Sequence, residues 1–302
     1  MDAVPSQSSV RARSRTPVRC NAKTLPAKQQ DSTRCSPSLL CVILGGPGSG
    51  KSLLGRHLQL RLPAFCSVSS GDLARRITAQ QGSPYLNSVT RQLADRRRRK
   101  VAFGRLTDVV TRVVASAVRS QNFRGVVVDG LREHELPAFE AAIACQYTLL
   151  IHLSCPKDVM VSRLAARQDR EGDVRLGLSE TDNARRVDAY LAREKAEINS
   201  LRAYCEHPTK SFFDFDATLG IHDLVDKVLR QVESFAASFG QSIDAVGTDV
   251  FGSGDPAYGG DAAEPELMDW KLHLEEIAAE LDEKFHPDGK PRVAAKDKPC
   301  ME

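Results

Sequence analysis

The chain has 302 residues, of which 27% are charged and 41% hydrophobic, and it carries a formal net charge of +3 at pH 7. These values are typical of an ordinary globular protein with one or two domains. No run approaches the roughly 20 apolar residues that a membrane-spanning helix needs, so we expect no membrane partner. The 8 cysteines include no C-x-x-C pair. That scatter argues against a disulfide framework or a zinc site and favours the reduced thiols of an intracellular protein.

Composition divides the chain into four segments. Residues 1–37 are rich in Ser, Pro, Arg and Gln without apolar periodicity, so we expect a disordered basic extension. Residues 38–238 alternate strand and helix patterns and should form the folded domain. Residues 239–265 are rich in Gly, Asp, Ser and Ala, as linkers are. The acidic segment 266–302 contains one amphipathic helix pattern, which either docks back on the core or binds a protein partner.

The arginines of the N-terminal segment bear on the compartment. Four arginines with few acids are a feature of mitochondrial presequences. Asp2, together with prolines at 5 and 17, disfavours the amphipathic helix that such a presequence forms. We therefore expect a plain flexible tail on a cytoplasmic protein, with mitochondrial targeting as the alternative.

The strand patterns of the folded domain are nearly all apolar and are separated by helical patterns. Strands are expected at 39–44, 64–68, 125–129, 147–153 and 211–215. Helices are expected at 51–61, 71–80, 85–98, 106–120, 135–144, 156–168, 180–204 and 221–236. This alternation predicts an α/β three-layer sandwich in which helices cover both faces of a five-stranded parallel sheet. Ligands of such folds bind beyond the carboxyl ends of the strands.

Residues 45–52 fit the pattern G-x-x-x-x-G-K-[ST] between the first strand and the first helix. That context is typical of a phosphate-binding loop, or P-loop. Its glycines let successive backbone N–H groups point at one phosphate. Lys51 can reach the outer phosphates, and the Ser52 hydroxyl suits Mg²⁺, the expected cofactor. ATP should therefore contact Gly46, Pro47, Gly48, Ser49, Gly50, Lys51 and Ser52.

Further polar patterns follow the strands. Asp129 ends an apolar strand, where a carboxylate beside a P-loop can hold a Mg²⁺-bound water. The segment S-G-D-L-A-R at 70–75 opens a helix after a strand. Arg163 and Arg167 lie four residues apart on one helix face. Arginine suits phosphate because its planar guanidinium binds two oxygens at once.

The P-loop form G-G-P-G-S-G-K, S-G-D-L-A-R, V-V-V-D-G-L-R at 126–132 and R-L-A-A-R at 163–167 occur in the order found in nucleoside-monophosphate kinases. Over residues 38–236 the chain resembles that family, especially its short-lid adenylate kinases. The resemblance implies catalytic roles for Lys51, Arg132, Arg167, Arg175 and Arg186, and an ATP contact from Arg163. It implies contacts with the acceptor nucleotide from Ser70, Arg75, Val101, Arg132, Arg175 and Arg186.

Some positions depart from the family's pattern. Ser52 follows the lysine directly, where the family usually has G-K-G-T. The family's phosphate-binding arginine aligns with Glu133, so Arg132 would have to replace it. Pro137 stands where adenylate kinases have the glutamine that helps to read adenine, and the asparagine that marks uridylate–cytidylate kinases is not there either. The lid, at about 168–178, lacks the family's two aspartates and has no cysteines, so no structural zinc is expected.

The resemblance implies transfer of the γ-phosphoryl group of Mg-ATP to a nucleoside monophosphate, with AMP expected first. The departures leave UMP, CMP or another monophosphate as the alternative acceptor. A catalytically weak nucleotide-binding scaffold that acts through its C-terminal extension is an alternative of a different class. Nucleic acid is not expected as a partner, because the basic run 96–100 has few aromatic residues nearby to stack bases.

Overall fold

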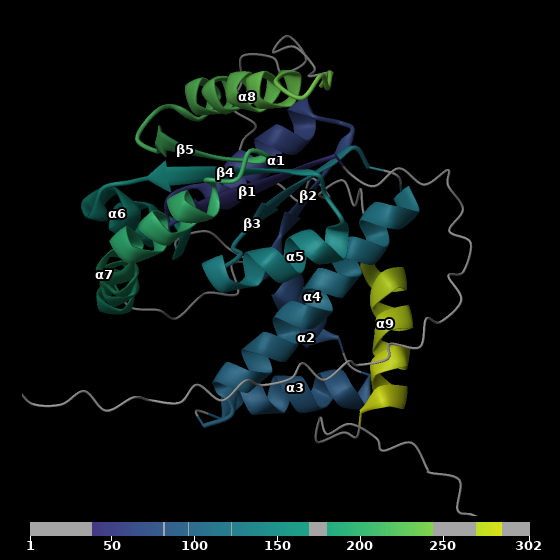
Figure 1. Ribbon diagram of the computed structural model, residues 1–302. Coiled ribbons are helices and arrows are strands. Elements are labelled where there is room, and N and C mark those ends of the chain that lie inside the picture. The colour runs from purple at the N-terminus through teal and green to yellow at the C-terminus, as the bar shows by residue number, and fades with distance from the viewer. Residues whose placement is uncertain are drawn as a thin grey trace, which may run out of the picture. The chain divides into compact units, whose positions relative to one another are not determined.

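The computed structural model describes residues 38–80, 82–95, 97–121, 123–168, 180–243 and 270–285. The expected N-terminal extension and most of the expected linker lie outside these ranges. Five parallel strands form one sheet in the order β2-β3-β1-β4-β5 (Figure 1). The strands are β1 (Leu39–Gly45), β2 (Phe65–Ser69), β3 (Gly125–Asp129), β4 (Tyr147–Ser154) and β5 (Lys210–Asp216). All five expected strands are confirmed to within one residue at each end.

Helices connect the strands and cover both faces of the sheet. In chain order they are α1 (Lys51–Arg61), α2 (Ser70–Ala79), α3 (Pro84–Ala94), α4 (Arg99–Gln121), the 3₁₀ turn η1 (Glu133–Glu135), α5 (Leu136–Ile143), α6 (Lys157–Gln168), α7 (Glu180–Tyr204), α8 (Ile221–Ala237) and α9 (Trp270–Lys284). None of the helices in the described part of the chain is long and apolar enough to cross a membrane.

The central strand β1 separates two hydrophobic cores because successive side chains of a strand point to opposite faces. Leu40 and Val42 join the core that α2, α3, α4, α5 and α9 cover. Cys41 and Ile43 join the core that α1, α6 and α8 cover. Figure 1 shows α1 and α8 on one side of the sheet and α4 and α5 on the other. The predicted three-layer α/β sandwich is confirmed.

The strand register brings the polar ends of several strands to one edge of the sheet. Asp129 at the end of β3 pairs with Ile43 of β1 and with Ser69 of β2. Gly45, where the P-loop begins, pairs with Leu153 near the end of β4. Residues that are far apart in the sequence therefore meet where the P-loop leaves the sheet, which is the expected place for a ligand.

The described part of the basic run does not end α3: Arg97 and Arg98 lie in the turn between α3 and α4, and Arg99 and Lys100 begin α4. The prediction for this region was a helix over 85–98 and another from 106, but α3 ends at Ala94 and α4 begins at Arg99. Asp95 makes the turn between them. Its side chain accepts a hydrogen bond from the Arg97 amide over 2.9 Å, and its carbonyl accepts one from the Arg99 amide over 2.9 Å. Aspartate favours such turns because its carboxylate can bond to the backbone two residues on.

Helix α9 docks on the core, which is the first of the two arrangements left open by the sequence. Trp270, Leu274, Ile277 and Leu281 are buried in the same core as the apolar faces of α3 and α4. The stripe residue Leu267 lies outside the described residues. Helix α9 thus completes the fold beside the long helix α4.

Candidate active site

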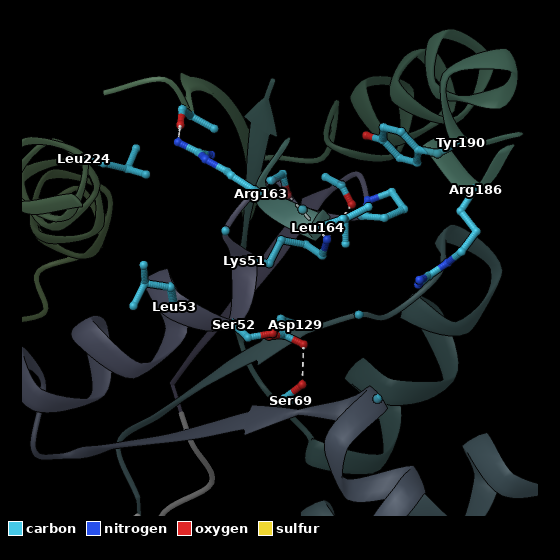
Figure 2. Close-up of a pocket in the computed structure, with 18 of the residues that line it drawn as sticks. Lys51, Ser52, Leu53, Ser69, Asp129, Arg163, Leu164, Arg186, Tyr190 and Leu224 are labelled. Atoms are coloured by element: carbon cyan, nitrogen blue, oxygen red, sulfur yellow. Dashed lines mark hydrogen bonds between the residues drawn. The ribbon is translucent and has the colours of Figure 1, made fainter. Parts of the chain in front are cut away.

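A cavity of about 820 Å³ lies at the carboxyl end of the sheet, where the P-loop joins α1 (Figure 2). Its walls come from the P-loop, the ends of β2 and β3, helices α2, α6 and α7, and the turn that leads into α8. Among the described residues that line it, the only carboxylate is that of Asp129. The basic side chains that line it are those of Lys51, Arg75, Arg132, Arg163, Arg186 and Arg193. Such an excess of positive charge in a concave site attracts a polyanion.

The P-loop wraps around the side chain of its own lysine. Lys51 Nζ donates hydrogen bonds to the carbonyl oxygens of Gly45 and Gly46 over 2.8 and 2.6 Å. Gly48 has a φ of 80°, and a Cβ there would lie 2.5 Å from the Met160 carbonyl oxygen, so the loop requires glycine at this position. Helix α1 starts directly after the loop, and its N-terminal amides favour an anion there.

Asp129 and Ser52 supply oxygen atoms beside the P-loop. The Asp129 side chain is buried, and its Oδ1 accepts a hydrogen bond from Ser69 Oγ over 2.8 Å. Both Asp129 and Ser52 line the cavity. Mg²⁺ in phosphoryl-transfer sites takes one or two protein oxygens and completes its shell with phosphates and water. A hydroxyl and a carboxylate at the mouth of a P-loop fit that requirement.

Two arginines line the part of the cavity next to α2 and α4. Arg75 forms an ion pair with Asp72 one turn away on α2. The guanidinium of Arg132 lies 5.6 Å from the centre of the Phe103 ring. Glu133, the carboxylate that stands at the family's arginine position, accepts a hydrogen bond from Ser200 of α7 and is not among the residues that line the cavity. The Glu133 carboxylate is therefore directed away from the site.

Several expected site residues are not brought to the cavity wall. Gly46, Ser70 and Val101 are not among its lining residues. The Ser70 hydroxyl donates to the Asp129 carbonyl over 2.7 Å, and Val101 is 58% exposed on α4. Arg167 lies on α6 with its side chain outside the described set, and Arg175 and the rest of the expected lid lie outside it altogether. Their roles stay predictions.

The cavity also has walls that the sequence did not single out. Ala217, Leu219, Ile221 and Leu224 give it an apolar wall beside Arg163, whose guanidinium donates to the Ala217 carbonyl over 2.8 Å. The segment between β5 and α8 follows the carboxyl end of a predicted strand. Because ligands bind at that edge of the sheet, its position was a signal available in the sequence. Tyr190 lines the cavity one helical turn after Arg186 (Figure 2).

An all-parallel sheet with a phosphate-binding loop at the end of its central strand defines a P-loop nucleotide-binding protein. A family model described as an AAA domain matches residues 41–188. UMP-CMP kinase 2 from Oryza sativa subsp. japonica is 30% identical over 176 residues, which cover 53% of this chain and 67% of that protein. The chain belongs to the nucleoside-monophosphate kinase family.

Three more proteins are similar to the chain. UMP-CMP kinase from Prunus armeniaca is 31% identical over 133 residues, which cover 43% of this chain and 54% of that protein. A shikimate kinase from Acinetobacter baumannii, solved in complex with shikimate, has a TM-score of 0.42 at 17% identity. The similarity covers 66% of this chain and 94% of the shikimate kinase chain. An unliganded sugar kinase from a Janibacter species has a TM-score of 0.39 at 14% identity. That similarity covers 67% of this chain and 98% of the sugar kinase chain.

Proposed function

We propose that this protein transfers the γ-phosphoryl group of Mg-ATP to a pyrimidine nucleoside monophosphate, UMP or CMP. The observation that carries the proposal is the single cavity into which the P-loop and arginines of α2, α6 and α7 all converge. Both curated relatives carry the name UMP-CMP kinase. Phosphoryl transfer depends on positioning and on charge stabilisation, which such a ring of cations supplies.

ATP would occupy the P-loop side of the cavity. The loop amides and Lys51 would hold its β- and γ-phosphates. Ser52, with Asp129 acting through a water molecule, would hold Mg²⁺, which neutralises charge on the transferring phosphate when bound. The apolar wall at Leu219, Ile221 and Leu224 suits the flat face of a base. Arg163 lies beside that wall and would close the site over the triphosphate.

The monophosphate would occupy the side towards α2 and α4. Arg75 and Arg132 both line this side of the cavity, and a guanidinium can bind two phosphate oxygens at once. Because Glu133 is directed towards Ser200 of α7, Arg132 meets no carboxylate from its neighbour in the site. This geometry supports the substitution of Arg132 for the displaced family arginine.

Arg186 would face the phosphoryl group in transfer from α7, with Arg167 near the end of α6 and Arg175 of the lid joining it. During transfer, the leaving oxygen of ATP and the attacking oxygen of the monophosphate share a negative charge, which these cations offset. The site also has to exclude water, because water would otherwise accept the phosphoryl group. No general base is needed beyond groups that orient the acceptor phosphate.

AMP is the second candidate acceptor, since S-G-D-L-A-R at 70–75 resembles the segment that adenylate kinases use. Pro137, at the start of α5, has no side-chain amide to read adenine. A coupled assay of ADP formation with UMP, CMP, AMP and dTMP separates the acceptors. We expect kcat/KM at least about tenfold higher for UMP or CMP than for AMP, which corresponds to about 1.4 kcal/mol. A preference for AMP would overturn the pyrimidine assignment and leave the kinase assignment standing. ATP binding without any transfer would favour the scaffold alternative.

A further inference from the structure

A buried histidine lies behind the P-loop at the centre of a polar network. His152 on β4 is 3% exposed, and it pairs in register with Leu44 of β1 and with Asp214 of β5. Its Nδ1 donates to Asp214 Oδ1 over 2.7 Å, since a carboxylate can only accept. Its Nε2 lies 3.3 Å from the Tyr190 hydroxyl and 3.4 Å from Glu194 Oε1. A buried polar group with partners on both sides fixes the orientation of whatever it bonds.

The network connects the sheet to helix α7 at two places. Tyr190 donates its hydroxyl proton to Glu194 Oε1 over 2.8 Å, one turn along the same helix. Burial and the hydrogen bond to Glu194 raise the pKa of Tyr190 above its ordinary value, so its hydroxyl keeps its proton well into the alkaline range. Towards the end of α7, Arg202 pairs with Asp214, the partner of His152. The rotation of α7 about its own axis is thereby fixed relative to β4 and β5.

The ring of Tyr190 also packs directly on the P-loop. A Cβ placed at Gly46 would lie 2.8 Å from both Cδ1 and Cε1 of Tyr190, so only glycine allows this close approach. The carbonyl of the same Gly46 accepts the 2.6 Å hydrogen bond from Lys51 Nζ. One aromatic ring therefore lies between the hydrogen-bond network and the loop that holds the catalytic lysine.

Arg186 lies four residues before Tyr190, and residues four apart share one face of a helix. Both line the cavity, and Figure 2 shows them on neighbouring turns of α7. Val187, between them, is fully buried, so hydrophobic packing holds the helix against the core. Hydrophobic packing is non-directional and does not by itself fix the rotation of the helix about its axis. The hydrogen bonds of the Tyr190 hydroxyl fix that rotation.

We propose that Tyr190 and His152 are positioning residues that hold α7 in the orientation in which Arg186 faces the transferring phosphoryl group. The inference rests on the proposed kinase function. It assigns neither residue a contact with the reacting atoms, because His152 is buried behind the loop and the hydroxyl of Tyr190 bonds to Glu194. The hydroxyl of Tyr190, and not its ring, carries the positioning role, since the hydroxyl donates its proton to Glu194 and its oxygen lies 3.3 Å from His152 Nε2.

The test compares Tyr190→Phe with Tyr204→Phe, its matched control. Tyr204 ends the same helix, and its hydroxyl bonds to Glu140, away from the residues that line the cavity. We expect Tyr190→Phe to lower kcat about tenfold, while the Kd for ATP, measured directly by titration, changes less than about twofold. Tyr204→Phe should leave both values near those of the parent. His152→Leu should lower kcat similarly, and if it fails to fold, Tyr190→Phe alone decides.

A double-mutant cycle shows whether the effect acts through Arg186. If it does, Tyr190→Phe should lower kcat no further in an Arg186→Ala background. An equal fall in both backgrounds, or a kcat for Tyr190→Phe within about 1.5-fold of an active parent, would overturn the inference. A parent chain without turnover on any monophosphate would instead overturn the proposed function, and the inference with it.

Discussion

The hydroxyl of Ser69 donates a 2.8 Å hydrogen bond to Oδ1 of Asp129, and this bond joins the carboxyl ends of β2 and β3 beside the P-loop. The two residues are also partners in the strand register. The bond fixes one carboxylate oxygen of the only acidic residue among the described residues that line the cavity. The orientation of this carboxylate is therefore set by the sheet before any ligand binds.

Replacing Asp129 should weaken the use of Mg²⁺. Asp129→Asn keeps the size of the side chain and removes its charge, so we expect kcat to fall at least about tenfold and the Mg²⁺ concentration for half-maximal rate to rise. Asp216→Asn is the matched control, because Asp216 also ends a strand but bonds to Thr218 outside the cavity. Equal behaviour of the two variants in a Mg²⁺ titration of the rate would contradict the metal assignment.

Replacing Lys51 should abolish turnover and leave the fold intact. Lys51→Met keeps the length of the side chain but cannot offset charge on the outer phosphates. We expect no measurable ADP formation, with a circular dichroism spectrum and thermal midpoint close to those of the parent. Lys157→Met is the control, since Lys157 pairs with Asp188 on the surface and does not line the cavity. Parent-like activity of Lys51→Met would remove the P-loop from the mechanism.

The docking of α9 should contribute measurably to stability. Leu281 is 1% exposed against the core, whereas Leu272 on the same helix is 52% exposed. Leu281→Ala should lower the free energy of unfolding by about 2–5 kcal/mol through lost burial and the cavity left behind. Leu272→Ala should change it by less than about 0.5 kcal/mol. Urea unfolding curves that shift equally for both variants would show that α9 does not pack on α4.

A polar contact adds to the docking of α9. Asp282 Oδ1 accepts a hydrogen bond from the Tyr85 amide at the start of α3 over 2.8 Å, and another from Ser83 Oγ over 3.1 Å. Asp282→Ala removes one hydrogen-bond acceptor from the start of α3, so we expect the free energy of unfolding to fall by about 1 kcal/mol. Glu283→Ala, at the next position of α9 and exposed, makes a suitable comparison in the same unfolding experiment. Indistinguishable midpoints for Asp282→Ala and the parent would contradict the cap.

Two cysteines should be chemically silent in the folded protein. Burial raises the pKa of Cys41 and of Cys66 from 9.0 to about 12, with the nearby Cys145 adding to the rise at Cys41. At about pH 8 both are thiols, and the thiolate is the nucleophile. Iodoacetamide followed by mass spectrometry should find both unmodified in the native protein and modified in denaturant. Native labelling at the rate of an exposed thiol would contradict their burial.

The same raised pKa values have a consequence for stability. Between about pH 9 and 12 the unfolded chain releases these protons and the folded chain keeps them, so unfolding becomes more favourable as the pH rises. The contribution of each thiol is fully present below about pH 9 and is lost towards pH 12. The free energy of unfolding should fall over this interval less steeply in Cys66→Ala than in the parent.

The central features were predictable because local patterns determine them. The apolar run 39–44, the glycine pattern after it and Asp129 at a strand end each depend on a few adjacent residues. The start of α4 at Arg99 was not predictable in this way, since the basic run shows no apolar periodicity. Its helix begins after a turn in which Asp95 bonds to the Arg97 amide two residues on, and a search for apolar periodicity does not detect that signal.

Other features depend on contacts between distant segments. Tyr190 has the spacing of an ordinary core residue on a helix, and only the fold shows that its ring lies on Gly46. The stripe from Trp270 to Leu281 predicts an apolar face on α9 but not what covers it. Asp282 caps a helix that lies far away in the sequence, and no local pattern carries that pairing.

The most direct test of the central claim is transfer of label from [γ-³²P]ATP to UMP or CMP, with Mg²⁺ and excess protein, in the parent and in Lys51→Met. We expect labelled UDP or CDP in the parent and none in the variant. Tight ATP binding by the parent without labelled diphosphate from any nucleoside monophosphate would contradict it.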